Sequence, residues 1–313
     1  MQRLTTIAEV RAAVGEARRA GGRVALVPTM GALHEGHLAL VREAASDADL
    51  TVVSIFVNPT QFDRPDDLAA YPRDLEGDEG QLAELGDLAP DVVFAPEVAE
   101  VYPRPSVTRV TVRGLTDRLC GASRPGHFDG VATVCTKLFS IVQPDLAVFG
   151  RKDFQQLAVI RRVVADLDLP VEVVGAPTVR EPDGLAMSSR NRRLGPAERR
   201  SALCLSRALR AGVAVARAGR AGGGPIDAVR VANEVGGTLS AAPGVTVDYV
   251  EVLDPETLAP PDATSRGQAG DGSPEAQQQL LVAVAADVGP VRLIDNVVLG
   301  DTEDEERLLA ATS

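Results

Sequence analysis

The sequence predicts an α/β protein with a Rossmann-type parallel sheet and a second, smaller α+β domain. Up to about residue 176, short apolar runs alternate with segments of helical periodicity, and strands buried on both faces of a parallel sheet read as such runs. After Arg180 the pattern changes to helices followed by three longer strand-like runs. A chain of 313 residues has room for two domains. We place them at 1–178 and 179–313.

The strands predicted for the first domain are apolar runs bounded by turn residues. They lie at Val24–Val27, Thr51–Val57, Asp91–Ala95, Leu146–Phe149 and Val171–Val174. The segments between them, and the first twenty residues from Met1 to Ala20, place apolar residues at helical spacing and predict amphipathic helices. The alternation of polar and apolar residues in Val107–Val112 predicts a separate edge or hairpin strand.

The second domain begins after the strong turn Glu181–Gly184. Its predicted elements are two helices, Ala197–Ala216 and Ile226–Leu239, and three strands, Val245–Val252, Leu280–Ala286 and Val291–Leu299. Residues 259–279 are rich in Pro, Gly, Ser, Asp and Gln, a composition typical of a flexible insertion. We assign no chemistry to that stretch.

The amino-acid composition excludes several classes of binding partner. The net charge of −12 argues against non-specific binding to nucleic acid or to an anionic membrane, so a polyanion must be met by a local pocket. No apolar run approaches the ~18–20 residues that cross a bilayer, which predicts no membrane span. Cys120, Cys135 and Cys204 are far apart and form no CxxC pair. A reducing, cytoplasmic location is therefore predicted.

Two of the three histidines lie in one short sequence motif, or word, His34-Glu35-Gly36-His37. It lies where a predicted strand is followed by a predicted helix. Such a junction offers a phosphate free backbone N–H groups and the positive end of a helix dipole, and imidazoles add donors. The HExxH spacing of zincins is absent, so a metal bound by the pair is disfavoured. We interpret the word as a nucleotide-phosphate cradle; the alternative is a turn with two surface histidines.

A second word, Gly150-Arg151-Lys152-Asp153, directly follows a predicted strand. Ligands of open α/β sheets bind beyond the carboxyl ends of strands, which places this word on the same rim as His37. Lys152 is one of only two lysines among 32 basic residues, which favours a role that needs a compact ammonium group. Asp153 is predicted to cap the following helix. The alternative is an ordinary charged loop.

The third word, Met187-Ser188-Ser189-Arg190-Asn191, follows the turn at the start of the second domain. Two hydroxyls and a guanidinium suit a triphosphate, because arginine grips phosphate through two parallel hydrogen bonds and serine donates a third. Arginine-rich loops are also common on solvated surfaces, and that interpretation stays open.

The fourth word, Asn58-Pro59-Thr60-Gln61-Phe62, follows the predicted strand Thr51–Val57. Amides at a carboxyl edge can bind the hydroxyl and carboxylate of a substrate without adding charge to a site crowded by a nucleotide. Gln156, near the start of the helix after Asp153, is predicted to face the same space. The alternative for each glutamine is a surface position.

Together these words resemble the pantoate:β-alanine ligase family, or pantothenate synthetases, of the nucleotidyltransferase superfamily that includes class I aminoacyl-tRNA synthetases. The matching segments, in family order, are Val27–His37, Ile55–Phe62, Tyr71–Arg73, Gly126–Val131, Phe149–Gln156, Asp183–Asn191 and Leu293–Asn296. They span nearly the whole chain. His34–His37 corresponds to the HIGH word of the superfamily, and Met187–Arg190 corresponds to its KMSKS-like loop.

The resemblance implies an ATP-dependent ligase that condenses (R)-pantoate with β-alanine through a pantoyl adenylate, releasing AMP and pyrophosphate. It also implies Mg²⁺, a homodimer, a Rossmann-type domain that binds nucleotide and pantoate, and a smaller C-terminal domain that closes as a lid. Two alternatives remain. One is another nucleotidyltransferase, such as an adenylyltransferase, which would share HxGH but lack the Asn-Pro-Thr-Gln-Phe and Gly-Arg-Lys-Asp words. The other is a nucleotide-binding regulatory module without turnover.

Roles for individual residues follow from the same resemblance. The implied catalytic residues are His34, His37 as the presumed proton donor, Lys152 and Arg190. The implied ATP-binding residues are Met30, Gly31, Ala32, Leu33, His34, Glu35, Gly36, His37, Gly150, Arg151, Lys152, Asp153, Val179, Met187, Ser188, Ser189 and Arg190. The implied substrate-binding residues are Asn58, Gln61, Tyr71 and Gln156. Asp78 with Gln81 is chosen as the metal site over Asp74 and Glu76, and a structural role is preferred for His127.

Overall fold

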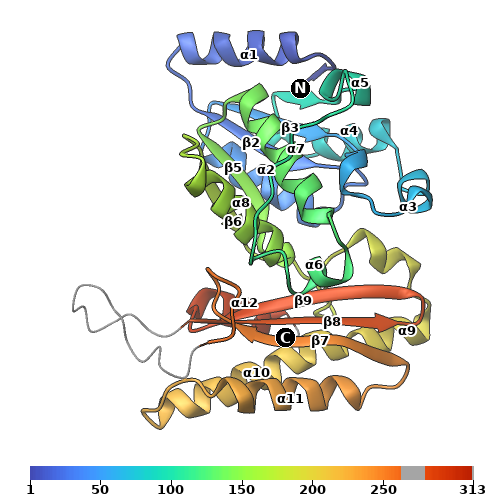
Figure 1. The fold of residues 1–313 in the computed structure, drawn as a ribbon, viewed down its shortest axis with the longest axis vertical. Coiled ribbons are helices and arrows are strands. Elements are labelled where there is room, and N and C mark those ends of the chain that lie inside the picture. The colour runs from blue at the N-terminus through green and yellow to red at the C-terminus, as the bar shows by residue number, and fades with distance from the viewer. Residues whose placement is uncertain (262–278, 312–313) are drawn as a thin grey trace. The chain divides into compact units, whose positions relative to one another are not determined.

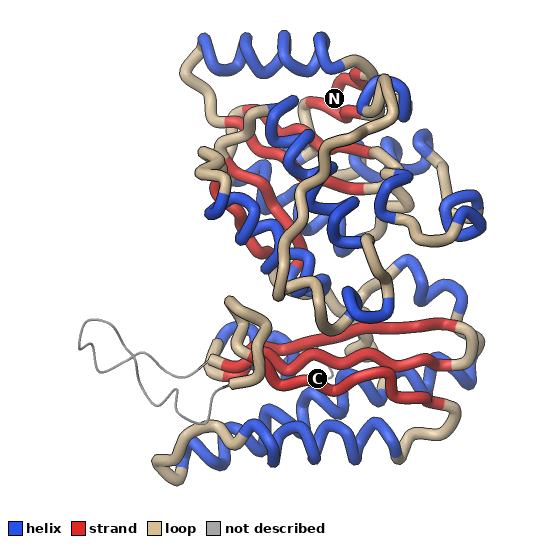
Figure 2. Tube along the Cα trace, in the orientation of Figure 1, coloured by secondary structure: helices blue, strands red, loops and turns tan. Residues whose placement is uncertain are grey.

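The computed structural model describes residues 1–261 and 279–311. They form two compact units, Met1–Thr178 and Val179–Ser313. The first unit is α/β with a parallel sheet, and the second is a smaller α+β unit with an antiparallel sheet (Figures 1 and 2). The predicted fold class is thereby confirmed.

The first unit is built on six parallel strands in the order β1-β4-β3-β2-β5-β6. Their bounds are β1 Gln2–Leu4, β2 Val24–Thr29, β3 Leu50–Ile55, β4 Val92–Phe94, β5 Leu146–Gly150 and β6 Glu172–Ala176. The order of strands reverses on either side of β2, since β3 and β4 lie to one side and β5 and β6 to the other. The gap between the loops that follow β2 and β5 is therefore a topological switch point, the usual ligand position in such sheets.

The first unit also contains eight α-helices. They are α1 Ile7–Arg19, α2 Glu35–Ser46, α3 Pro65–Ala69, α4 Leu75–Ala83, α5 Val98–Val101, α6 Cys120–Ser123, α7 His127–Val142 and α8 Phe154–Asp166. The four residues Val24–Val27 of β2 are all fully buried, and since successive side chains point to opposite faces, both faces of the sheet are covered. This double burial is why β2 reads as a continuous apolar run.

The described part of the second unit combines three antiparallel strands, in the order β7-β8-β9, with four helices. The strands are β7 Val245–Leu253, β8 Leu280–Val288 and β9 Val291–Leu299; the helices are α9 Pro196–Ala202, α10 Cys204–Ala221, α11 Ala228–Ser240 and α12 Thr302–Ala310. Its core joins Leu205 and Leu209 of α10, Val235 of α11 and Val284 of β8. The unit thus has a hydrophobic core of its own.

Three predictions about single elements were wrong or incomplete, and one helix was missed. The N-terminal segment is not one helix, because β1 precedes α1. Val107–Val112 forms no strand: Val107 is 96% exposed, and the N–H of Val110 donates to Oγ1 of Thr133. The helix predicted at Ala197–Ala216 is divided into α9 and α10, and α12 was not predicted. Most of the predicted insertion 259–279 lies outside the described residues.

Candidate active site

The candidate site of the first unit lies at the carboxyl edge of the parallel sheet. β2 pairs with β3 on one side and with β5 on the other, so the loops after these three strands leave the sheet at the same edge. Three of the four predicted words follow these strands: the His34–His37 word after β2, the Asn58–Phe62 word after β3 and the Gly150–Asp153 word after β5. The structure therefore brings these three words to one edge.

The turn after β2 is held by a buried carboxylate. Gly31 and Ala32 have φ angles of +79° and +52°, a left-handed conformation that is costly for alanine. Asp78 of α4 is only 3% exposed; its Oδ2 accepts from the Ala32 N–H (2.9 Å) and its Oδ1 from the Leu33 N–H (2.7 Å). A Cβ atom on Gly31 would lie 2.7 Å from Oδ2 of Asp78. The turn requires glycine at 31 and an acceptor at 78.

His34 is fixed as a hydrogen-bond donor at the start of α2. It is the N-cap residue, and its Nδ1 accepts from the Gly36 N–H at 3.1 Å. When the ring is neutral, this bond places the proton on Nε2, where it can be donated to a ligand. The ring of His37 lies beside it, with 4.1 Å between ring centroids.

His37 is uncharged at neutral pH. Burial, the adjacent His34 and the nearby Lys152 lower its pKa to about 3, while Asp153 acts in the opposite direction. Its Nδ1 is buried and has no hydrogen-bond partner among the described residues. A neutral imidazole offers a ligand one N–H donor but no positive charge, so before any ligand binds, His37 is a hydrogen-bonding group rather than a cation.

Lys152 lies on the short 3₁₀ turn Arg151–Asp153 that joins β5 to α8. Its Nζ is 3.9 Å from Oδ2 of Asp153. Asp153 occupies the N-cap position of α8 but its side chain makes no capping hydrogen bond, so the prediction that it caps the helix was wrong.

Two other side chains of the predicted ATP set are engaged within the protein. Nε of Arg151 donates to the Gly175 carbonyl on β6 at 3.0 Å. Glu35 forms an ion pair with Arg42 on the exposed surface of α2. Neither contact involves the turn after β2. Because the side chain of Glu35 is paired with Arg42, we expect Glu35 to contact a ligand at that turn mainly through its backbone.

The amide word after β3 is ordered by its own hydrogen bonds. Nδ2 of Asn58, which is buried, donates to Oε1 of Gln61 (3.0 Å) and to the Gly130 carbonyl (3.1 Å). Oδ1 of Asn58 accepts from Tyr102 Oη at 3.0 Å. Because Oε1 of Gln61 accepts from Asn58, its Nε2 is left to donate to Sδ of Met30 at 3.0 Å. This contact joins the loop after β3 to the turn after β2.

Helix α7 fixes the backbone of the same word. A Cβ atom on Gly130 would lie 2.4 Å from the Thr60 carbonyl oxygen, so only glycine allows this approach. Nδ1 of His127 lies 2.8 Å from the Gln61 carbonyl oxygen, which can only accept, so Nδ1 is the donor. Burial, with a smaller effect of Arg124, lowers the pKa of His127 to about 4. These contacts agree with the structural role preferred for His127.

Two residues beside the site were not predicted from the sequence. Tyr102 holds Asn58 but belongs to no recognisable word. Gln155 is buried and fixes the loop before α6: its Oε1 accepts from the Cys120 N–H, and its Nε2 donates to the carbonyls of Leu115 and Arg118. The periodicity of α8 could have shown Gln155 to be internal, since Ala158 and Val159, three and four residues further along, are buried on the same side of the helix. Gln156 is partly buried, and Tyr71 packs edge-on against Phe62.

The contacts of Asp78 are those of a structural carboxylate and do not favour a resident magnesium ion. Mg²⁺ needs near-octahedral oxygen ligands and retains waters, whereas the carboxylate of Asp78 is buried and both of its oxygens accept backbone hydrogen bonds. Within residues 1–261 and 279–311 there is no group of three or more His, Cys, Asp or Glu that could hold a metal. Magnesium binding by Asp78 and Gln81 stays a prediction.

The fourth word lies in the second unit. The Met187 N–H donates to the Val179 carbonyl at 2.9 Å, and an isolated bridge joins Arg180 to Ala186. Beyond this hairpin, Oγ of Ser188 accepts from the Arg190 N–H at 3.3 Å. The side chains of Ser188 and Ser189 are partly exposed and that of Arg190 is exposed.

Comparison with known proteins identifies the family. The sequence model for "Pantoate-beta-alanine ligase" matches residues 2–298. The chain belongs to the pantoate-β-alanine ligase family. No described helix is long and apolar enough to cross a membrane.

Relatives of the ligase family match along their whole length. A pantothenate synthetase of Geobacter sulfurreducens is 49% identical over 303 residues, covering 97% of this chain and 100% of that protein. A solved pantothenate synthetase of Thermus thermophilus has 46% identity and a TM-score of 0.81, and covers 95% of this chain and 99% of that one. A pantoate-β-alanine ligase of Francisella tularensis, solved with β,γ-ATP and β-alanine, has 31% identity and a TM-score of 0.72, with coverages of 96% and 98%.

Proposed function

We propose that the chain is an ATP-dependent ligase that condenses (R)-pantoate with β-alanine to give pantothenate, with release of AMP and pyrophosphate. The observation that carries the proposal is the meeting of three words at the carboxyl edge of the sheet, where His34, His37 and Lys152 flank the switch point. The family membership and the Francisella ligase solved with an ATP compound and β-alanine support the same chemistry.

The reaction proceeds in two steps. The carboxylate of pantoate attacks the α-phosphorus of ATP, and pyrophosphate leaves as pantoyl adenylate forms. The amine of β-alanine then attacks the activated carbonyl carbon, the carbon–oxygen bond to the phosphate breaks, and AMP leaves with the bonding electrons. The protein contributes by positioning the reactants and by donating to the negative charge that develops.

In this scheme the phosphates are met from both units. Nε2–H of His34, an N–H of His37 and the ammonium of Lys152 donate from the first unit, and Ser188, Ser189 and Arg190 donate from the second, which acts as a lid. The ATP site is formed by Met30, Gly31, Ala32, Leu33, His34, Glu35, Gly36, His37, Gly150, Arg151, Lys152, Asp153, Val179, Met187, Ser188, Ser189 and Arg190.

Pantoate is held by Gln61 and Gln156, with Asn58 and Tyr71 beside it, and Gln61 also faces β-alanine. The contact of Gln61 with Met30 supports this placement, because it directs the amide to the turn that receives the nucleotide. Since neutral His37 carries no charge, Lys152 and Arg190 supply the positive charge that ATP requires.

The remaining parts of the proposal concern the ion and the assembly. Mg²⁺ would enter with ATP and supply charge neutralisation at the phosphate oxygens, which it prefers to an all-protein cage. We also propose a homodimer, on the strength of the family resemblance, and a cytoplasmic location, because the three cysteines are far apart and form no CxxC pair.

Two product assays test the proposed function. Pyrophosphate release from ATP should require pantoate, and AMP should accumulate only when β-alanine is also present. Pyrophosphate release that is equally fast without pantoate, or a dinucleotide-like product, would instead indicate another nucleotidyltransferase. Binding of ATP with no turnover of any substrate pair would indicate a regulatory module.

A further inference from the structure

We propose that Arg199 is a positioning residue for the Ser188-Ser189-Arg190 segment, which it holds through Glu181, Asp183 and Asn191. The proposal rests on the proposed function, in which that segment binds the phosphates of ATP. All of these residues belong to the second unit.

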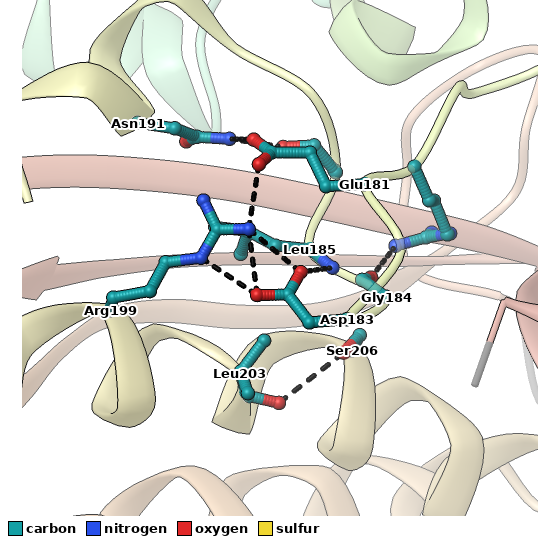
Figure 3. Close-up of polar contacts among 10 residues, drawn as sticks. Glu181, Asp183, Gly184, Leu185, Asn191, Arg199, Leu203 and Ser206 are labelled. Atoms are coloured by element: carbon teal, nitrogen blue, oxygen red, sulfur yellow. Dashed lines mark hydrogen bonds and ion pairs between the residues drawn. The ribbon is translucent and has the colours of Figure 1, made fainter. Parts of the chain in front are cut away.

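The guanidinium of Arg199 joins two carboxylates of the hairpin that precedes the segment (Figure 3). Its Nε donates to Oδ2 of Asp183 (2.8 Å) and its Nη2 to Oδ1 (2.8 Å), a bidentate pair; Nη2 also donates to Oε2 of Glu181 at 2.6 Å. Because two carboxylates already neutralise it, Arg199 is not itself a group for binding phosphate. Because Arg199 lies on α9, these bonds connect the hairpin to that helix.

Glu181 transmits this contact to the far end of the segment. Its second oxygen, Oε1, accepts from Nδ2 of Asn191 at 2.5 Å, as the dashed line in Figure 3 shows. Nδ2 of Asn191 also donates to the Ala186 carbonyl at 3.0 Å, and the side chain is buried. Asn191, directly after Arg190, is therefore anchored to the hairpin by its amide.

The near end of the segment is fixed as firmly. Arg180 is paired with Asp295 of β9 through two hydrogen bonds of 2.7 and 2.9 Å, and both side chains are buried. The Met187 N–H donates to the Val179 carbonyl. Residues 188–190 thus lie between two anchored ends. Arg199 contributes to both, through the carboxylates of the hairpin and through the contact of Glu181 with Asn191.

Anchoring both ends gives the segment its shape before ATP binds, so less conformational entropy is lost on binding. Without Arg199, the carboxylates of Glu181 and Asp183 would face each other and the incoming triphosphate without compensation. The loss should therefore fall on ATP, and the step in which β-alanine attacks should be spared.

Steady-state kinetics of Arg199→Ala and Arg199→Lys test the proposal. We expect the KM for ATP to rise about tenfold in Arg199→Ala and less in Arg199→Lys, because an ammonium makes ion pairs but not the planar bidentate contact. The KM for β-alanine should stay within about twofold, since the amine binds after the phosphates have reacted. Amide hydrogen exchange at residues 187–191 of the ligand-free enzyme should become faster.

Arg292→Ala is the matched control. Arg292 pairs with Asp248 in the same unit through Nε and Nη2, at 2.9 and 2.6 Å, and these side chains are 28% and 33% exposed, against 27% and 35% for Arg199 and Asp183. Its loss should leave the KM for ATP unchanged. Equal effects in both variants, or equal effects on the KM of all three substrates, would overturn a positioning role and leave only a structural one.

Two outcomes separate the proposal from the proposed function. If the wild-type enzyme shows no pantoate-dependent pyrophosphate release, the function fails, yet faster exchange at 187–191 in Arg199→Ala still supports the anchor. If exchange there is unchanged, the anchor fails whatever the activity. Should Arg199→Ala not fold, Glu181→Gln carries the same test, because it keeps the size of the side chain and removes its charge.

Discussion

Two histidines of the first unit are kept uncharged by burial, which makes stability depend on pH. The pKa values of His37 and His127 fall to about 3 and about 4 from an ordinary 6.5. As pH drops below 6.5, the unfolded chain takes up protons that the folded chain does not, so the stability present above that pH is progressively lost towards pH 4.

The prediction is that His127→Gln flattens this loss. Chemical denaturation at a series of pH values gives the free energy of unfolding of the wild type and the variant, and the wild-type curve should be the steeper one between pH 6.5 and 4. Parallel curves over that window would contradict the account, because the carboxylates that also titrate there are common to both proteins.

The donors at the carboxyl edge are predicted to act on the first chemical step. His37→Ala and Lys152→Ala should each lower the rate of adenylate formation by at least ~10²-fold, since each removes a donor aimed at developing charge. The measurement is pantoate-dependent pyrophosphate release, and unchanged circular dichroism confirms the fold. Arg162→Ala, which breaks an exposed ion pair on α8, is the control and should retain full activity. Near-normal turnover of both site variants would refute their roles.

A substitution at Asp78 distinguishes a role in holding the turn after β2 from a role in binding a metal ion. In Asp78→Asn, an amide –NH₂ would face a backbone N–H of the turn, so the free energy of unfolding should fall by about 1–3 kcal/mol with one donor left unsatisfied. The measurement is denaturation in EDTA without nucleotide. A variant as stable as the wild type in EDTA, but with weaker Mg²⁺ dependence, would favour the metal ligand instead.

At the scale of elements, burial on both faces explains which strands could be predicted. Runs such as Val24–Val27 are unbroken because each residue meets a covered face. β1 escapes this signal, since of its three residues only Leu4 is buried. Val107–Val112 gives the opposite error: it alternates like a strand, yet no described strand pairs with it. Alternation shows that a segment could form a strand, but it does not show that another strand is present to pair with it.

The close contact between α7 and the amide word yields a prediction for a helix interior. Gly130→Ala should raise the KM for pantoate and lower the melting temperature, because its Cβ would meet the Thr60 carbonyl at 2.4 Å and displace the Gln61 backbone. Gly237→Ala in α11 is the matched control. Apart from its chain neighbours and the backbone of its own helix, no atom of the described residues lies within 4 Å of its Cβ, so the variant should be neutral or stabilising, as alanine is in exposed helices. Equal behaviour of the two variants would contradict the packing argument.

At the scale of the whole molecule, the sequence was informative wherever a functional word directly follows a strand. His37, Gln61 and Lys152 could be assigned to one edge because parallel strands end on the same side of a sheet. The contacts that hold these groups could not be assigned. Asp78 meets the Ala32–Leu33 backbone 46 and 45 residues away, and Arg199 meets Glu181 across a turn and a helix end. Such pairs depend on tertiary packing, which local patterns do not encode.

The proposed function requires His34, His37, Lys152 and the Ser188-Ser189-Arg190 segment to bind one ATP molecule. A crystal structure of the enzyme with ATP and pantoate tests it most directly. We expect a bound pantoyl adenylate or its substrates, with the α-phosphate within hydrogen-bonding distance of His34, His37 and Lys152, and with the Ser188-Ser189-Arg190 segment on the phosphates. A nucleotide bound away from the carboxyl edge of the parallel sheet, or with Ser188–Arg190 in a separate cleft, would contradict it.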